Sequence, residues 1–154
     1  MLIYLDTCCY SRPFDNIAHM IQASVQMEIA AIYAIIEICK SAGYNIVGSI
    51  AVRDELTNIN EPDKLKNSLT FYRETVNLYI PMSANIRSRA AGFMSMGLKD
   101  YDSFHLAFAE AAGADYLLTT DTRFKQACAK NNLSIVNVIN PSNFLPEVVK
   151  WAQQ

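Results

Sequence analysis

The stretch that decides the fold of this chain is YDSFHLAFAEAAGADYLLTTD, residues 101–121. Residues 101–112 have the apolar spacing of an amphipathic helix, and Gly113 follows, a residue favoured just after the last helical turn. The next run, residues 115–119, is short and apolar, which predicts a buried strand. Asp121 lies just past the end of that strand. A helix, a strand and an acid at the carboxyl end of the strand therefore follow one another directly.

The rest of the chain repeats this alternation of strands and helices. Further strands are predicted at residues 2–5, 45–48, 76–80 and 135–138. Helices are predicted at residues 16–42, 49–59, 62–75, 83–96 and 122–131, with a loop containing Pro13 after the first strand and a short final helix beginning at Pro141. Such alternation forms a parallel sheet with helices on both faces. We therefore predict an α/β fold in which residues 1–154 form a single three-layer α/β/α domain around a parallel sheet of about five strands.

The composition excludes several classes of protein. Hydrophobic residues make up 51% of the 154 residues and charged residues 18%, which is typical of a folded globular chain. The apolar run at residues 29–36 is much shorter than the roughly 20 residues that cross a bilayer. Residues 1–5 lack the basic start of a secretory signal. We therefore expect a cytoplasmic protein without a membrane segment.

The four cysteines predict neither a zinc site nor disulfides. Cys8 and Cys9 are adjacent, while Cys39 and Cys128 stand alone in apolar helical segments. The paired spacing of a tetrahedral zinc site is therefore missing. We interpret the four side chains as small buried thiols in a reducing compartment.

Four acidic residues fall where a parallel sheet binds its ligands. Asp6 follows the first strand, and Asp121 follows the fourth. Glu55 lies inside the helix after the second strand, and Asp102 lies at the start of the helix before the fourth. Ligands bind beyond the carboxyl ends of parallel strands. The four carboxylates therefore converge on one crevice if the first and fourth strands are neighbours.

A divalent cation would explain four carboxylates in one crevice. Without a basic partner, the carboxylates would repel one another and raise each other's pKa. Mg²⁺ prefers oxygen ligands and keeps several of its waters, so a few carboxylates suffice. Two such ions about 3.5–4 Å apart would activate a water and stabilise the leaving oxygen in phosphodiester hydrolysis. They would also let a chain of net charge −2 accept a phosphate, which its own charge does not favour.

Each of these acids also has a purely structural interpretation. Asp6 is placed to cap the turn after its strand, and Asp121 is placed to cap the following helix. Asp102 suits the positive end of a helix dipole and Glu55 suits a solvated helical surface, and each has an acidic neighbour that competes for the role. The functional hypothesis therefore depends on the four acids taken together.

The same residues resemble the PIN-domain family. Ile3-Tyr4-Leu5-Asp6-Thr7 and the following Ser11-Arg12-Pro13-Phe14-Asp15 are similar to the first strand and loop of the family, and Glu55 in Arg53-Asp54-Glu55-Leu56 matches its helical glutamate. Residues 97–107, GLKDYDSFHLA, resemble its Asp-x-x-His-Leu-Ala segment, with Asp102 as the acid. Residues 113–121, GADYLLTTD, look like its strand ending in Thr-Asp. The likeness spans nearly the whole chain, and residues 97–124 are its most specific part.

The resemblance implies a metal-dependent endoribonuclease. The expected reaction is Mg²⁺- or Mn²⁺-dependent hydrolysis of RNA phosphodiesters by metal-activated water, with Asp6, Glu55, Asp102 and Asp121 as catalytic residues and metal ligands. Many members of the family are toxins of VapC-type toxin–antitoxin pairs, which implies an antitoxin protein as a partner. Related sequences often carry a second acid directly after the position of Asp121. Thr122 stands there in this chain, and we expect this departure to loosen one metal site without removing the four acids.

Other polar residues near the acids have less specific interpretations. His105 lies three residues after Asp102, so both can share a helix face, which makes His105 a candidate metal ligand or acid–base group. We expect it instead to pack with Leu106 and to make a structural hydrogen bond. Arg12, Lys99 and Arg123 fall near predicted strand ends. They are candidates to steer phosphates towards the crevice, with ordinary surface charge as the alternative.

Aromatic residues near the strand ends are candidates to stack on bases. They are Tyr10, Phe14, Tyr101 and Phe124. For at least two of the four, we expect packing in the core instead.

The helical segment at residues 29–38 is apolar almost all round. Such a helix is either buried within the monomer or covered by a partner. We predict a homodimer interface or a docking surface for an inhibitory protein, with a helix buried in the monomer as the alternative. A second subunit would also add basic residues for binding RNA.

Two other functions remain open at this point. One is a catalytically inactive PIN-like module that binds nucleic acid or protein, against which the complete set of four acids argues. The other is a phosphatase or phosphotransferase with Asp6 as a covalent nucleophile. That chemistry usually has a second aspartate close behind the first, where this chain has Thr7, Cys8 and Cys9, and no glycine-rich phosphate loop is present.

Overall fold

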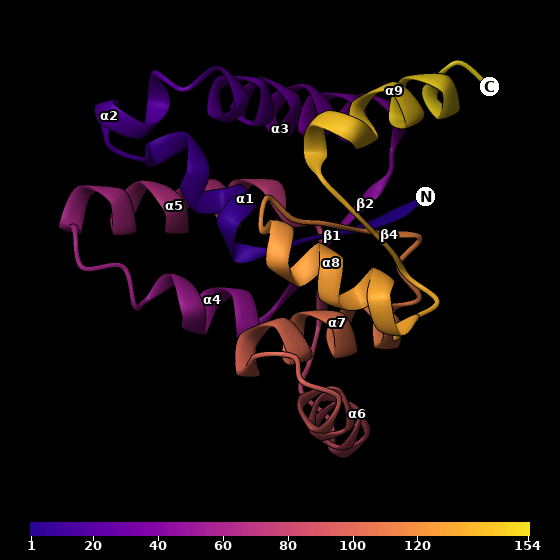
Figure 1. Ribbon diagram of the computed structural model, residues 1–154. Helices are drawn as coiled ribbons and strands as arrows, with labels where there is room; N and C mark the ends of the chain where they lie inside the picture. Colours follow the sequence, from indigo (N-terminus) through magenta and orange to yellow (C-terminus); the bar gives the residue numbers. More distant parts are fainter.

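A five-stranded, all-parallel sheet lies at the centre of the folded molecule (Figure 1). The computed structural model describes residues 1–154. The strands are arranged in the order β3-β2-β1-β4-β5. Their bounds are β1 (Leu2–Leu5), β2 (Asn45–Ser49), β3 (Leu78–Ile80), β4 (Tyr116–Leu118) and β5 (Asn137–Ile139).

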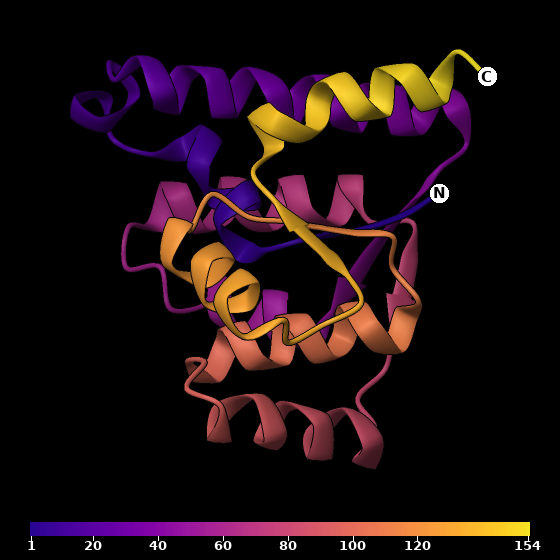
Figure 2. The same cartoon turned by 45° about the vertical axis from the view of Figure 1, so that its right-hand side comes forward.

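Helices cover both faces of this sheet. On one side, α3 and α9 run side by side, and on the other side α7 lies next to the sheet with α6 outside it (Figure 2). The predicted α/β class, with three layers and a parallel sheet of five strands, is therefore confirmed. The helices are α1 (Thr7–Ser11), the 3₁₀ helix η1 (Arg12–Phe14), α2 (Ile17–Met20), α3 (Ala23–Ala42), α4 (Ile50–Leu56), α5 (Pro62–Thr75), α6 (Ala84–Ser95), α7 (Asp100–Ala112), α8 (Thr122–Asn131) and α9 (Pro141–Ala152).

The central strand β1 is buried on both faces of the sheet. Ile3, Tyr4 and Leu5 have almost no exposed surface, as expected for a strand of a parallel sheet between helical layers. β1 pairs with β2 on one side and with β4 on the other. The chain builds the β2–β3 half first and then returns across β1 to build the β4–β5 half. The strand order therefore reverses beside β1, at the position where open parallel sheets bind ligands.

A glycine in β2 allows helix α5 to approach the sheet closely. A Cβ atom at Gly48 would lie 2.6 Å from the Tyr72 hydroxyl oxygen and 2.6 Å from the Val76 Cγ1. Both distances are shorter than side chains tolerate, so the end of α5 packs there only against a residue without a side chain.

The N-terminal third differs from the prediction in two places. The predicted loop around Pro13 is helical, because α1 and η1 follow β1 directly, and Pro13 is accepted in the first turn of η1. The predicted continuous helix 16–42 is two helices, α2 and α3, separated where Gln22 is extended. Asn16 caps α2 by accepting a hydrogen bond from the His19 N–H. No proline or glycine marks the break in the sequence.

Smaller differences occur at three other elements. The fifth strand is Asn137–Ile139 rather than 135–138, because Asn137 pairs with Tyr116 and Ile135 is 92% exposed. The third strand begins at Leu78 rather than at residue 76, because Val76 ends α5. The final helix is not short, since α9 continues through Pro146 to Ala152.

The apolar helix predicted at residues 29–38 belongs to α3, which is buried on one side only. Ile32, Ile35 and Ile36 lie in the core, and α9 packs along the same helix. Tyr33 and the preceding Met27 are exposed. No helix combines the length and the hydrophobicity needed to cross a membrane.

The cysteines form no disulfide. Cys9, Cys39 and Cys128 are buried, as predicted, and Cys8 is half-buried. All four thiols are free.

Candidate active site

A cleft of about 380 Å³ lies beyond the carboxyl ends of β1 and β4. The four acids singled out in the sequence, from four different parts of the chain, all contribute to its walls. β1 and β4 are neighbours, which is the condition on which this convergence depended. No lysine or arginine lines the cleft. Its lining consists of Asp6, Thr7, Cys8, Ser11, Glu55, Asn58, Ile59, Tyr101, Asp102 and Asp121.

Asp6 is held in place from several sides. Its backbone N–H donates to the carbonyl of Leu118 at 2.9 Å, which continues the pairing of β1 with β4 by one residue. Its Oδ2 accepts a hydrogen bond from the Thr119 hydroxyl at 2.7 Å, and the Cys8 thiol donates to the same oxygen at 3.2 Å. Asp6 is only 5% exposed. The carboxylate is therefore oriented before any ligand binds.

Glu55 reaches the cleft from the last turn of α4. Ser49, the last residue of β2, caps this helix by accepting a hydrogen bond from the Val52 N–H. The Glu55 Oε2 lies 2.7 Å from the Nε2 of His105. Burial by itself raises the pKa of Glu55, but the hydrogen bond and the charge of His105 outweigh it, so the pKa is lowered. Glu55 is therefore a carboxylate at neutral pH.

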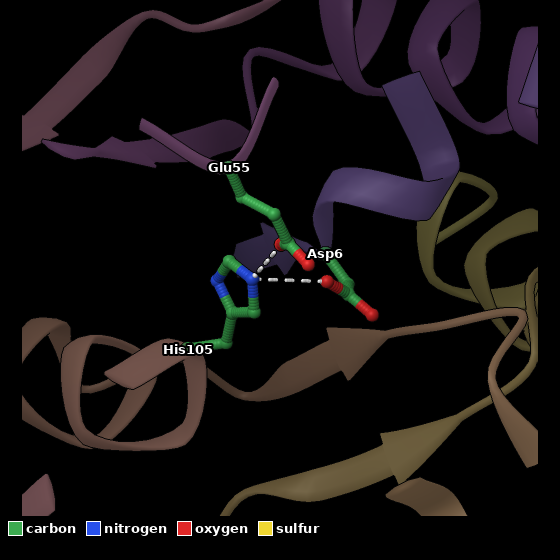
Figure 3. Close-up of side chains that lie close together, drawn as sticks. All are labelled: Asp6, Glu55 and His105. Atoms are coloured by element: carbon green, nitrogen blue, oxygen red, sulfur yellow. Dashed lines mark hydrogen bonds and ion pairs between the residues drawn. The ribbon is translucent and has the colours of Figure 1, made fainter. Parts of the chain in front are cut away.

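His105 points toward two of the acids, Glu55 and Asp6, and contacts both (Figure 3). Its Nε2 points between Glu55 and Asp6, with the Asp6 Oδ1 at 3.2 Å. Its Nδ1 lies 2.9 Å from the Tyr4 hydroxyl, which in turn contacts the Ser49 hydroxyl at 2.7 Å. Burial lowers the pKa of His105, but the charge of Asp6 and the hydrogen bond to Glu55 outweigh that effect and raise it. The imidazole is completely buried, and its Nε2–H lies between the two carboxylates.

Asp102, in the first turn of α7, is the acid without a partner. Its carboxylate makes no hydrogen bond and no ion pair. Partial burial raises its pKa to about 7, and the negative charges of Asp6 and Asp121 act in the same direction. Asp102 therefore gives up its proton less readily than an ordinary aspartate.

Asp121 both caps a helix and lines the cleft. Its Oδ1 accepts hydrogen bonds from the N–H groups of Arg123 at 2.8 Å and Phe124 at 3.1 Å, so it is the N-cap of α8 as its structural interpretation proposed. It also lines the cleft. Thr119 orients the turn before it by accepting a hydrogen bond from the Asp121 N–H at 2.9 Å.

The family model of the PIN domain matches residues 3–130. The chain belongs to the PIN domain family. This is a family of nucleases, and all four acids lie within the matched residues. A comparison with curated proteins gives no match.

Solved structures share the fold of this PIN domain at low sequence identity. One is the structure of VapBC2 from Rickettsia felis bound to a DNA fragment from the VapBC2 promoter. It has a TM-score of 0.58 and 15% identity over 91% of this chain and 98% of that chain. Another is VapBC-1 from nontypeable Haemophilus influenzae, with a TM-score of 0.53 and 13% identity over 92% of this chain and 99% of that chain.

The donor set of the PIN domain cleft fits a hard divalent cation. Candidate ligand atoms of Asp6, Glu55 and His105 lie within 4.8 Å of one another. Because the His105 Nε2–H donates to both carboxylates, His105 orients these two oxygen ligands instead of serving as one. Asp102 offers a carboxylate without a hydrogen bond or ion pair of its own, and Asp121 keeps its second oxygen outside the helix cap. Oxygen-rich sites of this kind suit Mg²⁺ or Mn²⁺.

Sequence reasoning did not foresee how closely His105 approaches the acids. Its separation of three residues from Asp102 placed both on one helix face. Contact with Glu55 and Asp6 depends on how α7 packs against α4 and β1, which no local pattern reports. The predicted structural hydrogen bonds of His105 are present, and its contacts with two acids are an addition.

The three basic residues that are candidates to steer phosphates differ in their surroundings. Arg12 is engaged by Asp15 at 3.3 Å, Glu28 at 3.1 Å and the Thr120 hydroxyl at 3.1 Å, so it holds loops together instead of facing the cleft freely. Lys99 and Arg123 are exposed and make no ion pair. Steering of phosphates by these two stays a prediction.

Two of the four candidate aromatic residues are in the core, as predicted. Tyr10 and Phe124 are at most 1% exposed. Phe14 packs edge-on against Phe71, away from the acids. Tyr101 lines the cleft.

Proposed function

We propose that this PIN domain is a divalent-metal-dependent endoribonuclease that hydrolyses RNA phosphodiesters. The observation that supports it best is the convergence of Asp6, Glu55, Asp102 and Asp121 on one cleft without a lysine or arginine in its walls. Such a cleft accepts a phosphate only with bound cations that reverse its field. Mg²⁺ or Mn²⁺ held by these four acids, when bound, activates water and stabilises the leaving oxygen.

The side chains around the acids have distinct tasks in this proposal. Thr119 and His105 fix the orientation of Asp6, and His105 does the same for Glu55. Asp102 must lose its proton before it serves as a ligand, because its pKa is raised to about 7. Asp121 is oriented by the first turn of α8. Thr122, which follows it, offers no carboxylate, so we expect a second cation to bind more weakly.

The proposed substrate is RNA, whose phosphates the exposed Lys99 and Arg123 would contact beside the cleft. Lys99 precedes α7 and Arg123 lies in the first turn of α8, next to the elements that carry Asp102 and Asp121. With a net charge of −2, the chain has no excess of positive charge to bind a long phosphate backbone, so contacts near the cut phosphate carry most of the binding.

The proposal includes partner proteins. The solved structures with this fold are VapBC assemblies, which supports a toxin role with an antitoxin as partner. Large apolar side chains on α2 and α3 are exposed, with Ile17 at 81% and Met27 at 63%. We assign this surface to a homodimer contact or to the antitoxin. Residues 1–154 would act as one domain in the cytoplasm.

The first experiment is cleavage of a covalently closed RNA circle and a linear single-stranded DNA with Mg²⁺, Mn²⁺ or EDTA. Asp6→Asn and Asp102→Asn are compared with Asp63→Asn; Asp63 is an exposed acid in the first turn of α5 without a side-chain hydrogen bond or ion pair. We expect metal-dependent opening of the circle by the wild type and by Asp63→Asn, and none by the two cleft variants.

Other outcomes separate the alternatives. Metal binding by calorimetry without cleavage of either substrate would contradict the nuclease and favour an inactive binding module. Cleavage that survives both cleft substitutions would mean that the site is elsewhere. Cleavage of DNA alone would contradict RNA as the substrate.

A further inference from the structure

A second hollow, of about 450 Å³, adjoins the acidic cleft between α4 and the start of α7. Its floor is apolar, formed by side chains of Ile50, Met82 and Phe104. Two exposed carboxylates, Asp54 and Asp100, stand among its lining residues. We call it the α4–α7 groove. Neither carboxylate belongs to the four acids of the cleft.

Tyr101 lines both hollows and so connects them. Its hydroxyl donates to the Asp54 Oδ2 at 2.8 Å and accepts from the Asn58 Nδ2 at 3.2 Å. Its ring stacks on His105, with centroids 6.4 Å apart and planes 26° apart. The ring is therefore held in one orientation by three neighbours. A fixed aromatic wall loses little conformational entropy when a ligand binds against it.

We propose that the α4–α7 groove binds an unpaired guanine base of the RNA, next to the phosphodiester that is cut. This inference rests on the proposed function of the cleft. Because the groove opens beside the acids, a nucleotide whose phosphate lies in the cleft places its base, or that of its neighbour, at Tyr101. Stacking of unpaired bases on aromatic side chains is a general mode of RNA recognition.

The chemistry of the walls selects a base over a phosphate and guanine over the other bases. The Asp54 and Asp100 carboxylates are acceptors only and repel phosphate. No lysine or arginine lines the groove. A base that pairs with these two acceptor carboxylates must present an edge rich in N–H donors. Guanine presents an N–H and an adjacent amino group on one edge, whereas adenine and cytosine present one amino group there and uracil a single N–H.

The test compares base preference in wild type, Asp54→Asn, Asp100→Asn and Asp63→Asn. Asp63 is a matched control for Asp100, because both are exposed acids in the first turn of a helix. Cut sites are mapped on single-stranded RNAs that carry one guanosine, adenosine, cytidine or uridine at a fixed position in an otherwise constant sequence. In parallel, the four nucleosides are titrated in EDTA and followed by NMR shifts of the Tyr101 and Phe104 ring signals.

We expect cuts next to guanosine to exceed the others by about tenfold, as one good carboxylate contact would supply. The preference should fall to near unity in Asp54→Asn and Asp100→Asn and persist in Asp63→Asn. Cleavage without a base preference, or with a preference unchanged in both groove variants, would overturn the inference and leave the nuclease intact. Guanosine-selective shifts without any cleavage would uphold the base site while refuting the nuclease. Neither cleavage nor selective shifts would overturn both.

Discussion

Replacement of Asp102 by asparagine should make the metal-free protein more stable, and increasingly so as the pH rises. Asparagine has the shape of the protonated acid but never becomes charged. The Asp102 carboxylate is charged in the unfolded chain above its ordinary pKa of 3.8, whereas in the folded protein its pKa is about 7. A group with a raised carboxylate pKa costs stability when it ionises. The substitution removes that cost.

The size and pH window follow from the two pKa values. Below pH 3.8 both states hold the proton, and the cost is absent. Between about pH 4 and 7 only the unfolded chain releases it, so the folded state loses stability as the pH rises. The full difference corresponds to about 4 kcal/mol above pH 7, and screening of the partly exposed carboxylate reduces it to about 2 kcal/mol. At pH 5 the same reasoning leaves about 1 kcal/mol or less.

Urea unfolding in EDTA at pH 5, 6, 7 and 8 measures this difference. Asp100→Asn is the control, because Asp100 is exposed in the same helical turn and its charge favours the N-terminus of α7. The control should show no gain at any pH. A gain for Asp102→Asn that is equal at pH 5 and pH 8, or absent at both, would refute the claim that Asp102 carries an uncompensated charge.

Three further predictions follow from the same structure. Affinity for Mg²⁺ should fall about tenfold per pH unit below pH 7, because Asp102 must release its proton to bind, and calorimetry on Asp102→Asn should show a flatter dependence. Gly48→Ala should lower the free energy of unfolding by about 1–3 kcal/mol, since its Cβ would lie 2.6 Å from the Tyr72 hydroxyl oxygen; urea unfolding measures it. Asp121→Ala should be about 1 kcal/mol less stable than Asp121→Ser, which keeps the helix cap, while RNA cleavage should be lost equally in both.

The parts of the fold that sequence predicted well are those with a strong local signal. The strand β4 was expected at 115–119 and spans Tyr116–Leu118, because its apolar residues are bounded by Gly113 and by Asp121. Gly113 takes the left-handed conformation with φ 68°, which ends α7 as the pattern indicated. The break between α2 and α3 at Gln22 had no such signal and was missed.

The positions of the acids could be predicted because strand ends are readable from sequence. Asp6 and Asp121 follow strands that proved to be neighbours, and the parallel topology leaves only one edge where both can lie. Glu55 is less directly determined, because its place depends on where α4 begins, which Ser49 sets as the helix cap. The α4–α7 groove was not predicted, since it forms from residues far apart in sequence.

The four acids of the cleft differ in the partners that stabilise their charges. A local sequence pattern could not reveal this difference. Asp6 and Glu55 share the proton of His105, and Asp121 is satisfied by backbone N–H groups of α8. Asp102 has no hydrogen bond or ion pair, and the charge of His105 offsets only part of the effect of burial and of the neighbouring acids. The three compensated acids keep their orientation in the metal-free protein, so a cation entering the cleft finds them in place. Asp102 is the acid of the cleft whose pKa is raised to about 7, and its proton must leave when a cation binds, so we expect this residue to carry most of the pH dependence of metal binding.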